Sequence, residues 1–478
     1  MKWRILILGL LVHFSTTGSA QPFWRAMGRG TVGPTEVQTL FGDTTTNRLL
    51  AGGTFETILN DNDAVLANGI AAWNGERWDS LGNRIAPSIG QTYWFLRFQG
   101  NLYACGGWGF LSSGGDVNWG LAKYEMGDEA WVELACANGN LTGPYQLVPK
   151  EPQGSSIYAT GLGGTLCGFP QACIYRYDGT AFHEWEPWAL IPPDNDNYVG
   201  YVFDFQGMTY MTGGFENPNE TALAYFMRYN GSAWEDVPGW NNAPGIKDIL
   251  IRNNTLYVAG SFRQSLGAPG NRIASFDGTT WNDMNGGLTL STAPNNGSAM
   301  TLEWHHDKLY VGGFFDEAAG EQLGGGLAVW DGLQWFAPPG QFSSAPSLPN
   351  GAIVLDITTW RDSLYICGGF NMIDGDTIRQ VAQFIGSDND LLPVGLRQHI
   401  APGQSTIFPN PASETITFVN APDRTREFQI RDGLGRCVLS GTWTRSPLQV
   451  AELRAGPYVL LLNDAGGAVI TSVRFIKR

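Results

Sequence analysis

One short apolar segment recurs along most of this chain and constrains its fold more than any other feature. The segment has the form LYVGGFF, and its copies begin at Leu49, Leu102, Ile157, Thr209, Leu256, Leu309 and Leu364. An aromatic residue before a turn recurs with the same spacing. Its copies are Trp73, Tyr124, Tyr177, Tyr229, Phe276, Trp330 and Phe384. Both landmarks repeat at about 50 residues, and such a period with about four strands per unit is typical of β-propeller blades.

Each repeat divides into four predicted strands. The first ends in a tight polar turn such as 361–363, the second is the LYVGGFF run, the third ends at an Asp-Gly or Asn-Gly pair, and the fourth carries a tryptophan. Asp331-Gly332 between two β-prone runs predicts a type I′ hairpin turn, in which both central residues take positive φ. A four-stranded sheet that is apolar on both faces is stable only between neighbours, so we expect the copies to stack.

The seventh repeat is incomplete, and the start of the chain can complete it. After Phe384 the sequence runs into Ser387–Asp390 with no tryptophan strand, whereas residues 23–30 read as a fourth strand that nothing precedes. We predict that these two parts pair and close a ring, which removes two exposed sheet edges. The predicted fold class is therefore all-β, a seven-bladed β-propeller closed by the N-terminal strand and followed by a small Ig-like β-sandwich.

Glycine pairs recur inside the second strands, for example at Gly312-Gly313 and Gly368-Gly369. Glycine within a strand is unfavourable for backbone entropy. We expect these pairs where neighbouring sheets crowd together and leave no room for a side chain.

The first 20 residues read as a secretory signal peptide. Lys2 and Arg4 precede a short apolar run, and 18–20 supply the small residues that favour cleavage before Gln21. We expect no other segment to span a membrane. The formal net charge of −15 argues against a nucleic-acid or anionic-membrane partner, because both need clustered Lys and Arg.

The rhythm of the sequence changes near Pro402. Residues 399–403 read as a linker between a propeller at 21–398 and a module at 404–478, in which four short alternating runs suit a small β-sandwich. Asp432-Gly433 and Gly435 mark predicted turns within it.

Both parts resemble known families. The repeat resembles the kelch and galactose-oxidase-like β-propellers, and more closely bacterial surface propellers with the pattern LYVGG-F…IA-WDG--W; a propeller fold does not define an activity. The C-terminal module resembles the type A sorting domain of type IX secretion in Bacteroidetes. The matching positions are Pro409, Asn410, Pro411, Asp432, Gly435, Arg436, Leu453, Gly456, Tyr458 and Lys477. This resemblance implies handling by the type IX machinery, export across the outer membrane, and then attachment to the surface or release.

The sequence offers little catalytic chemistry, and we predict no catalytic residues, cofactor or metal. His305 and His306 are adjacent, so in a strand their side chains would point to opposite faces. A copper site of the galactose-oxidase kind needs several convergent His and Tyr ligands. The three Asp-Asn-Asp runs at 61–63, 194–196 and 388–390 lack the spacing of a calcium loop and are read as turns.

Six cysteines are present, and secretion permits disulfides. Cys167 and Cys173 lie close together in one predicted loop and are the best candidate pair. Cys105 and Cys367 occupy the same repeat position inside strands and are expected to be buried thiols.

The connections between strands favour a binding site on one end of the propeller. The second and fourth connections are long and variable, and binding residues usually lie on such loops. Within them, the densest group of aromatic and acidic side chains is Trp185, Trp188, Asp194, Asp196 and Tyr198. Exposed aromatic rings beside acids suit a sugar or peptide ligand.

The sequence thus predicts a secreted or surface-attached binding or adhesion module for an unknown glycan or protein, without catalysis. Two alternatives stay open. An extracellular polysaccharide hydrolase or lyase would need convergent Asp, Glu, His or Tyr side chains at the central channel, and an architectural surface protein would show no saturable ligand.

Overall fold

A computed structural model of the chain divides into two compact units, 23–400 and 401–478 joined with 1–22. It describes residues 23–478 except for 33–34, 83–90, 110–116, 135–144, 149–155, 167–168, 186, 188–190, 192–196, 220–222, 345–351, 395–405, 409–411, 420–424, 433–434, 445 and 467–468. The predicted signal peptide and the predicted linker lie outside the described residues.

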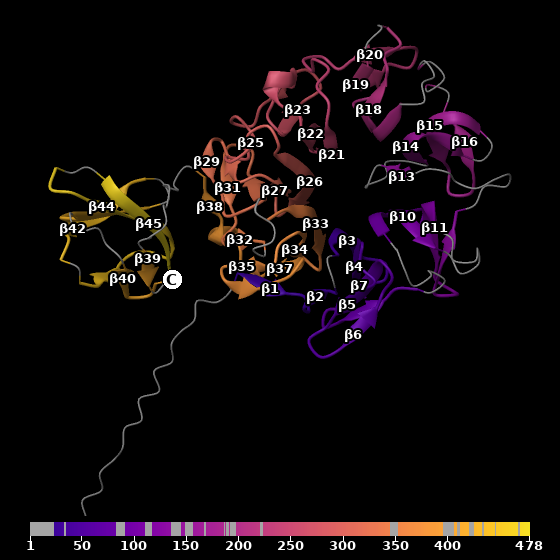
Figure 1. Ribbon diagram of the computed structural model, residues 1–478. Coiled ribbons are helices and arrows are strands. Elements are labelled where there is room, and N and C mark those ends of the chain that lie inside the picture. The colour runs from indigo at the N-terminus through magenta and orange to yellow at the C-terminus, as the bar shows by residue number, and fades with distance from the viewer. Residues whose placement is uncertain are drawn as a thin grey trace, which may run out of the picture. The chain divides into compact units, whose positions relative to one another are not determined.

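The larger unit is built mainly of antiparallel units of four strands that follow one another in chain order (Figure 1). Each sheet is named here after its first strand. The first sheets are β3 (Val37–Asp43), β4 (Arg48–Gly53), β7 (Ile70–Trp73) and β8 (Trp78–Ser80); β9 (Gln91–Phe98), β10 (Asn101–Gly109), β11 (Val117–Glu125) and β12 (Ala130–Glu133); and β13 (Tyr145–Val148), β14 (Ile157–Leu166), β15 (Phe169–Tyr177) and β16 (Phe182–Glu184).

The remaining sheets continue the pattern. They are β17 (Tyr198–Phe205), β18 (Met208–Glu216), β19 (Leu223–Tyr229) and β20 (Trp234–Asp236); β21 (Ile246–Arg252), β22 (Thr255–Gly260), β23 (Ile273–Phe276) and β24 (Trp281–Asn282); β26 (Ser298–His305), β27 (Lys308–Phe314), β30 (Leu327–Trp330) and β31 (Trp335–Ala337); and β33 (Val354–Trp360), β34 (Ser363–Gly368) and β37 (Val381–Phe384). A single bridge between Leu162 and Tyr198 joins β14 to β17. Repeated four-stranded antiparallel sheets fit a β-propeller.

The start of the chain supplies the fourth strand of the β33 sheet. Strand β1 (Trp24–Ala26) runs antiparallel to β37, with Trp24 opposite Phe384 and Ala26 opposite Ala382. In Figure 1 this indigo strand lies against the orange end of the larger unit. The pairing expected between residues 23–30 and the last repeat is therefore present.

A tryptophan on the outer strand of most sheets ties that sheet to the preceding one. Each indole N–H donates to a backbone carbonyl that follows the previous outer strand, at 2.7 to 2.9 Å. The pairs are Trp78 with Met27, Trp131 with Leu81, Trp234 with Pro187, Trp281 with Pro238, Trp335 with Met284, and Trp24 with Pro339. Four of these bonds, those of Trp24, Trp78, Trp131 and Trp335, satisfy buried donors and acceptors while the rings fill the space between sheets.

Glycines make room for these contacts. Gly82 follows the acceptor Leu81 and has φ +81°, and a Cβ there would lie 2.9 Å from Cδ1 of Trp131. At Gly312 in β27 the neighbouring sheet leaves no room for a side chain, since a Cβ would lie 2.7 Å from Cγ1 of Val354 in the β33 sheet. The expectation that glycine pairs mark crowding between sheets therefore holds for Gly312, whereas Gly313 meets the Ser298 carbonyl of its own sheet.

The type I′ turns lie at a different connection from the one predicted. In the Asp331-Gly332 turn only the glycine has positive φ, so the prediction for this pair was wrong. The Asp331 carboxylate instead accepts the backbone N–H groups of Leu333 and Gln334, at 2.8 and 2.9 Å, and closes a four-residue turn. Such capping by the side chain holds the turn without a second residue at positive φ.

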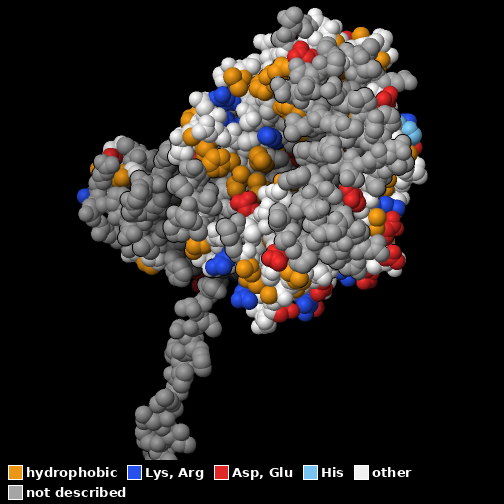
Figure 2. All heavy atoms as spheres, turned by 45° about the vertical axis from the view of Figure 1, so that its right-hand side comes forward, with side chains coloured by type: hydrophobic (Ala, Val, Ile, Leu, Met, Phe, Trp, Pro, Cys, Tyr) orange, Lys and Arg blue, Asp and Glu red, His pale blue; other side chains and the backbone are white. Residues whose placement is uncertain are grey.

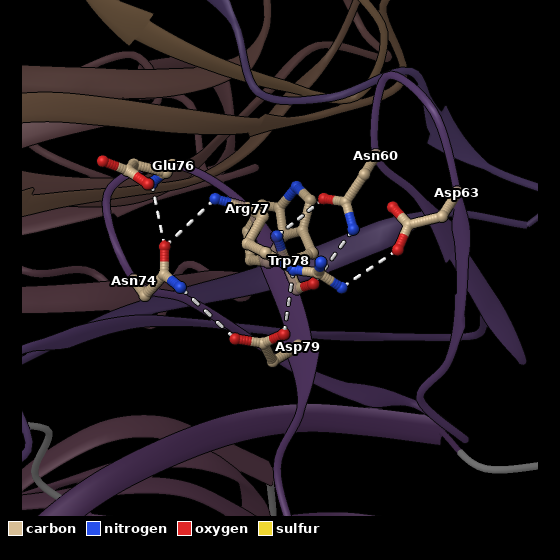
Figure 3. Close-up of polar contacts among 7 residues, drawn as sticks. All are labelled: Asn60, Asp63, Asn74, Glu76, Arg77, Trp78 and Asp79. Atoms are coloured by element: carbon tan, nitrogen blue, oxygen red, sulfur yellow. Dashed lines mark hydrogen bonds and ion pairs between the residues drawn. The ribbon is translucent and has the colours of Figure 1, made fainter.

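Asn74 forms the same turn in the β3 sheet, where it accepts the backbone N–H groups of Glu76 and Arg77 (Figure 3). Two residues at positive φ occur at the first connection of several sheets, in Asn253-Asn254, His306-Asp307 and Arg361-Asp362.

Some of the long second connections are regular. Three of them form small hairpins that take the preceding fourth connection as a third strand. They are β5 (Thr57–Leu59) and β6 (Ala64–Leu66) with β2 (Gly30–Thr31); β28 (Glu317–Ala318) and β29 (Glu321–Gln322) with β25 (Leu288–Thr289); and β35 (Met372–Ile373) and β36 (Asp376–Thr377) with β32 (Phe342–Ser343). The end of the propeller predicted to be irregular is thus partly built from sheets that link neighbours. The second connection of the β21 sheet holds a short 3₁₀ helix, η3 (Gln264–Leu266).

The C-terminal unit contains two antiparallel sheets with a shared core. One is β39 (Thr406–Phe408), β40 (Thr415–Val419) and β43 (Leu448–Gln449); the other is β42 (Cys437–Thr442), β41 (Glu427–Asp432), β44 (Gly456–Asn463) and β45 (Val469–Lys477). Ile416 and Leu448 from the first pack in one cluster with Ile430, Leu460 and Phe475 from the second.

Candidate functional site

The predicted cluster of aromatic and acidic residues stays a prediction, because three of its five members lie outside the described residues. These three are Trp188, Asp194 and Asp196. Trp185 is half-buried, and its ring packs edge-on against Tyr158 and Trp234, with centroids 5.4 and 5.8 Å apart. Trp185 therefore serves packing, whereas Tyr198 is 40% exposed at the start of β17.

A surface pocket of about 550 Å³ lies at the other end of the sheets, where the tight first connections are. Its walls come from the β26–β27 turn, the β33–β34 turn and the segment that follows β37. The lining includes His305, His306, Tyr310, Asp362, Phe384 and Asp388. Volumes of roughly 300–1,000 Å³ are usual for small-molecule sites.

The pocket forms where the repeat is broken. After β37 the chain turns through the 3₁₀ helix η4 (Asp388–Asp390). At its start the backbone N–H and the hydroxyl of Ser387 both donate to the Asp390 carboxylate, at 2.7 and 2.9 Å. The chain then pairs as β38 (Leu392–Pro393) with the outer strand β31 of the β26 sheet. The segment 385–391 thereby crosses from one sheet to its neighbour and lines the pocket.

The two adjacent histidines both line this pocket, so the prediction that they face opposite sides was wrong. Strand β26 ends at His305, and His306 has φ +46°, in the left-handed region. Strand alternation fails at that residue, and the two rings stack with centroids 3.8 Å apart. The backbone of the turn thus places both imidazoles on one side.

The polar groups of the pocket connect the two sheets. The Nε2 and Nδ1 atoms of His306 lie 3.2 Å from Asp362 and 3.6 Å from Asp388. Lys308 forms an ion pair with Asp388 at 2.6 Å. The Nδ1 of His305 lies within hydrogen-bond distance, 3.2 Å, of the Thr359 hydroxyl.

Burial sets the protonation of two of these groups. Burial, followed by the neighbouring His306, lowers the pKa of His305 from 6.5, although Asp362 and Asp388 act in the opposite direction. His305 is therefore neutral near pH 7. Burial and then the Asp388 carboxylate raise the pKa of Tyr310 above 10.0, so its hydroxyl stays protonated. That buried hydroxyl has no hydrogen-bond partner among the described residues.

Two buried carboxylates nearer the inner strands serve the fold. Asp356 accepts the Thr39 and Thr301 hydroxyls and the Leu40 and Ile357 backbone N–H groups at 2.8 to 3.0 Å. It lies at a β-bulge where the β33–β34 register shifts. Because its oxygens are occupied by donors from three sheets, we assign it to structure. Asp248 accepts the Leu302 N–H and the Tyr201 hydroxyl in the same way.

The Asp-Asn-Asp runs form turns where they are described. In the first, the Asn60 N–H donates to the Asp63 carbonyl, and Arg77 pairs with Asp63 and Asp79 (Figure 3). The run at 388–390 is η4, and 194–196 lie outside the described residues. No group of three or more His, Cys, Asp or Glu side chains among the described residues could hold a metal ion.

Cys105 is a buried free thiol, and burial raises its pKa to about 12. Cys367 is buried as well. The side chains of Cys167 and Cys173 lie outside the described part of the chain, so their pairing stays a prediction. Lys and Arg side chains are interspersed with Asp and Glu over the described part of the face shown in Figure 2.

The predicted sorting residues take part in the C-terminal unit. Arg436 forms an ion pair with Asp432 at 2.8 Å across a turn in which Gly435 has φ +77°. The Tyr458 hydroxyl donates to the Arg454 carbonyl, and Lys477 at the end of β45 pairs with Gly456. Leu453 packs against the core. Pro409, Asn410 and Pro411 lie outside the described residues.

Comparison with known families decides the role of this unit. Residues 406–477 match the family described as the secretion system C-terminal sorting domain. A type IX sorting domain indicates handling by the type IX machinery, and the protein is exported to the cell surface or secreted. None of the described helices is long and apolar enough to cross a membrane.

Solved structures give distant matches. The extracellular domain of BT4673 from B. thetaiotaomicron has a TM-score of 0.46 at 11% identity, over 94% of this chain and 47% of that one, so this chain spans about half of its length. PorZ, a surface component of the type IX secretion system of Porphyromonas gingivalis, gives 0.37 at 12% identity, over 90% and 68%. The WD40 repeats of RRP9 give 0.42 at 9%, over 78% and 99%. No curated protein matches in sequence.

Proposed function

We propose that the chain is a seven-bladed, kelch-like β-propeller that binds a glycan or protein at the cell surface without catalysing a reaction. In this proposal residues 1–20 are a signal peptide, 21–398 form the propeller, and 404–478 are an Ig-like sorting domain. The blade count follows from the repeat, and the pairing of β1 with β37 supports a closed ring.

The pocket between the β26 and β33 sheets is the observation that carries the binding role. Its polar groups come from two sheets and from the crossing segment 385–391, and contacts of His306 and Lys308 with Asp388 link them before a ligand arrives. A preformed concave site with a few convergent polar groups and apolar walls is the usual form of a ligand site. Phe384 and Leu364 supply apolar lining beside His305 and Asp362.

The binding role can be tested with the full exported chain. We expect saturable binding to a ligand on an array that carries extracellular glycans and proteins. If the chain shows no saturable binding to any arrayed glycan or protein, the result would contradict the proposal and favour an architectural role. The export part is tested separately, because deletion of 404–478 should hold the protein in the periplasm.

A further inference from the structure

The Tyr310 hydroxyl is the starting point for identifying the ligand. Tyr310 lines the pocket, and its side chain is fully buried. Its hydroxyl is protonated because burial and Asp388 raise its pKa, and it has no acceptor among the described residues. A buried donor without an acceptor is unfavourable, so a group that occupies the pocket and accepts this hydrogen bond is stabilised there.

The charges of the pocket restrict what that acceptor can be. Lys308 is paired with Asp388, and His306 lies between Asp388 and Asp362. The Asp362 side chain is 87% exposed and contacts His306, so its carboxylate remains an available acceptor. An anionic ligand would bring its charge next to these two carboxylates, and like charges at short distance repel.

The hydrogen-bonding groups of Tyr310 and Asp362 also exclude a simple ammonium group as the ligand. The occupant must accept from Tyr310 and donate to Asp362. An ammonium group donates but cannot accept, whereas a carboxylate accepts but cannot donate. A hydroxyl does both. A ring that carries several hydroxyls presents both functions within the reach of a single pocket.

We infer that this pocket binds a neutral sugar residue of a glycan, with Tyr310 as hydrogen-bond donor and Asp362 as acceptor. The inference rests on the proposed binding function and specifies its ligand class and site. The stacked imidazoles of His305 and His306, together with Phe384, provide ring surfaces beside the polar groups. A peptide amide, which also donates and accepts, is the competing occupant that the test must separate.

Tyr310→Phe and Asp362→Asn test the two contacts in the full chain. The first removes only the hydroxyl. The second removes the charge at a turn residue with φ +59°, a conformation that Asn also accepts. Tyr103→Phe and Asp307→Asn are matched controls, because Tyr103 occupies the same repeat position as Tyr310, and Asp307 is the equivalent turn residue in the β26 sheet. The probes are arrays of neutral, amino and acidic glycans and of peptides.

We expect the wild-type chain and both controls to bind a neutral glycan, and Tyr310→Phe and Asp362→Asn each to bind it about tenfold more weakly. The melting temperature of Tyr310→Phe should equal or exceed that of the wild type, because the substitution removes an unpaired buried donor and no protein acceptor is lost. Preferred binding to acidic glycans, amines or peptides, or equal binding of neutral glycans by all variants, would overturn the inference and leave the proposed binding function standing. No binding to any glycan or protein would overturn both.

Discussion

The indole N–H of Trp24 donates a hydrogen bond to the carbonyl oxygen of Pro339, 315 residues away in sequence, at 2.7 Å. Trp24 lies on β1 in the β33 sheet, whereas Pro339 follows the outer strand of the β26 sheet. Trp335 makes the equivalent bond to the Met284 carbonyl one sheet earlier, so the pairing of β1 with β37 preserves the contact between neighbouring sheets. Strand β1 is thus attached by backbone pairing with β37 and by the indole of Trp24, which bonds to the neighbouring β26 sheet.

Replacement of Trp24 by Phe should weaken this closure. The variant loses the N–H donor and leaves the buried Pro339 carbonyl without it, which costs about 1–3 kcal/mol in free energy of unfolding. Thermal or denaturant unfolding of the full chain measures the loss. Trp73→Phe is the control, because Trp73 is also buried but its indole nitrogen has no partner among the described residues. Equal losses in the two variants would show that the bond contributes nothing.

Gly312→Ala should separate the β26 and β33 sheets. The new methyl group would lie 2.7 Å from Val354 and 2.8 Å from Thr301, which forces side chains on both sheets to shift. Overpacking of this kind lowers the free energy of unfolding by about 1–3 kcal/mol. Gly127→Ala is the control, since nothing lies within 4 Å of a Cβ at that position. Denaturant unfolding should show a loss for Gly312→Ala alone, and an unchanged Gly312→Ala variant would refute the crowding.

The repeat made the sheets predictable, because the copies share the same succession of strands and turns and most carry a tryptophan on the outer strand. The pairing of β1 with β37 was also predictable, since one repeat lacked a strand and the chain began with a spare one. The turn types were not, because the dipeptide Asp-Gly does not reveal that the Asp331 side chain caps the turn. Hairpin twist favours a type I′ turn at such a dipeptide, whereas hydrogen bonds to the Asp331 carboxylate favour the four-residue turn that is present.

The pocket was missed for two physical reasons. Alternation of side chains was assumed through His305 and His306, but the left-handed backbone at His306 places both rings together. The signal that could have located the pocket was the break in the repeat after Phe384. Residues 385–391 do not continue their own sheet, and they line the pocket where the chain crosses to β31.

Asp43→Asn should reduce stability at neutral pH and flatten its dependence on acid. Burial tends to raise the pKa of Asp43, but hydrogen bonds from Arg97 and Thr46, with the Arg97 charge, lower it below 3.8 overall. The stabilising contribution is therefore present above pH 3.8 and is lost as the pH falls through the lower folded pKa. The melting temperature of wild type and variant should differ most near neutral pH and converge in acid. A constant difference would contradict the linkage.

His305 should make the protein less stable in mild acid. Its pKa is below 6.5 in the folded chain, because burial and then His306 and Lys308 disfavour its charged form, while Asp362 and Asp388 only partly compensate. The unfolded chain thus binds a proton at higher pH than the folded one, and stability is lost as the pH falls from 6.5 through the folded pKa.

His305→Gln keeps a hydrogen-bonding group near Thr359 but cannot titrate. Between pH 7 and about pH 5, where ordinary carboxylates stay ionised, the melting temperature of the wild type should fall more steeply than that of the variant. Parallel curves would mean that His305 titrates in the folded protein as it does in the unfolded chain. Above pH 7 the imidazole is largely neutral in both the folded and the unfolded chain, so we expect the difference in slope to vanish there.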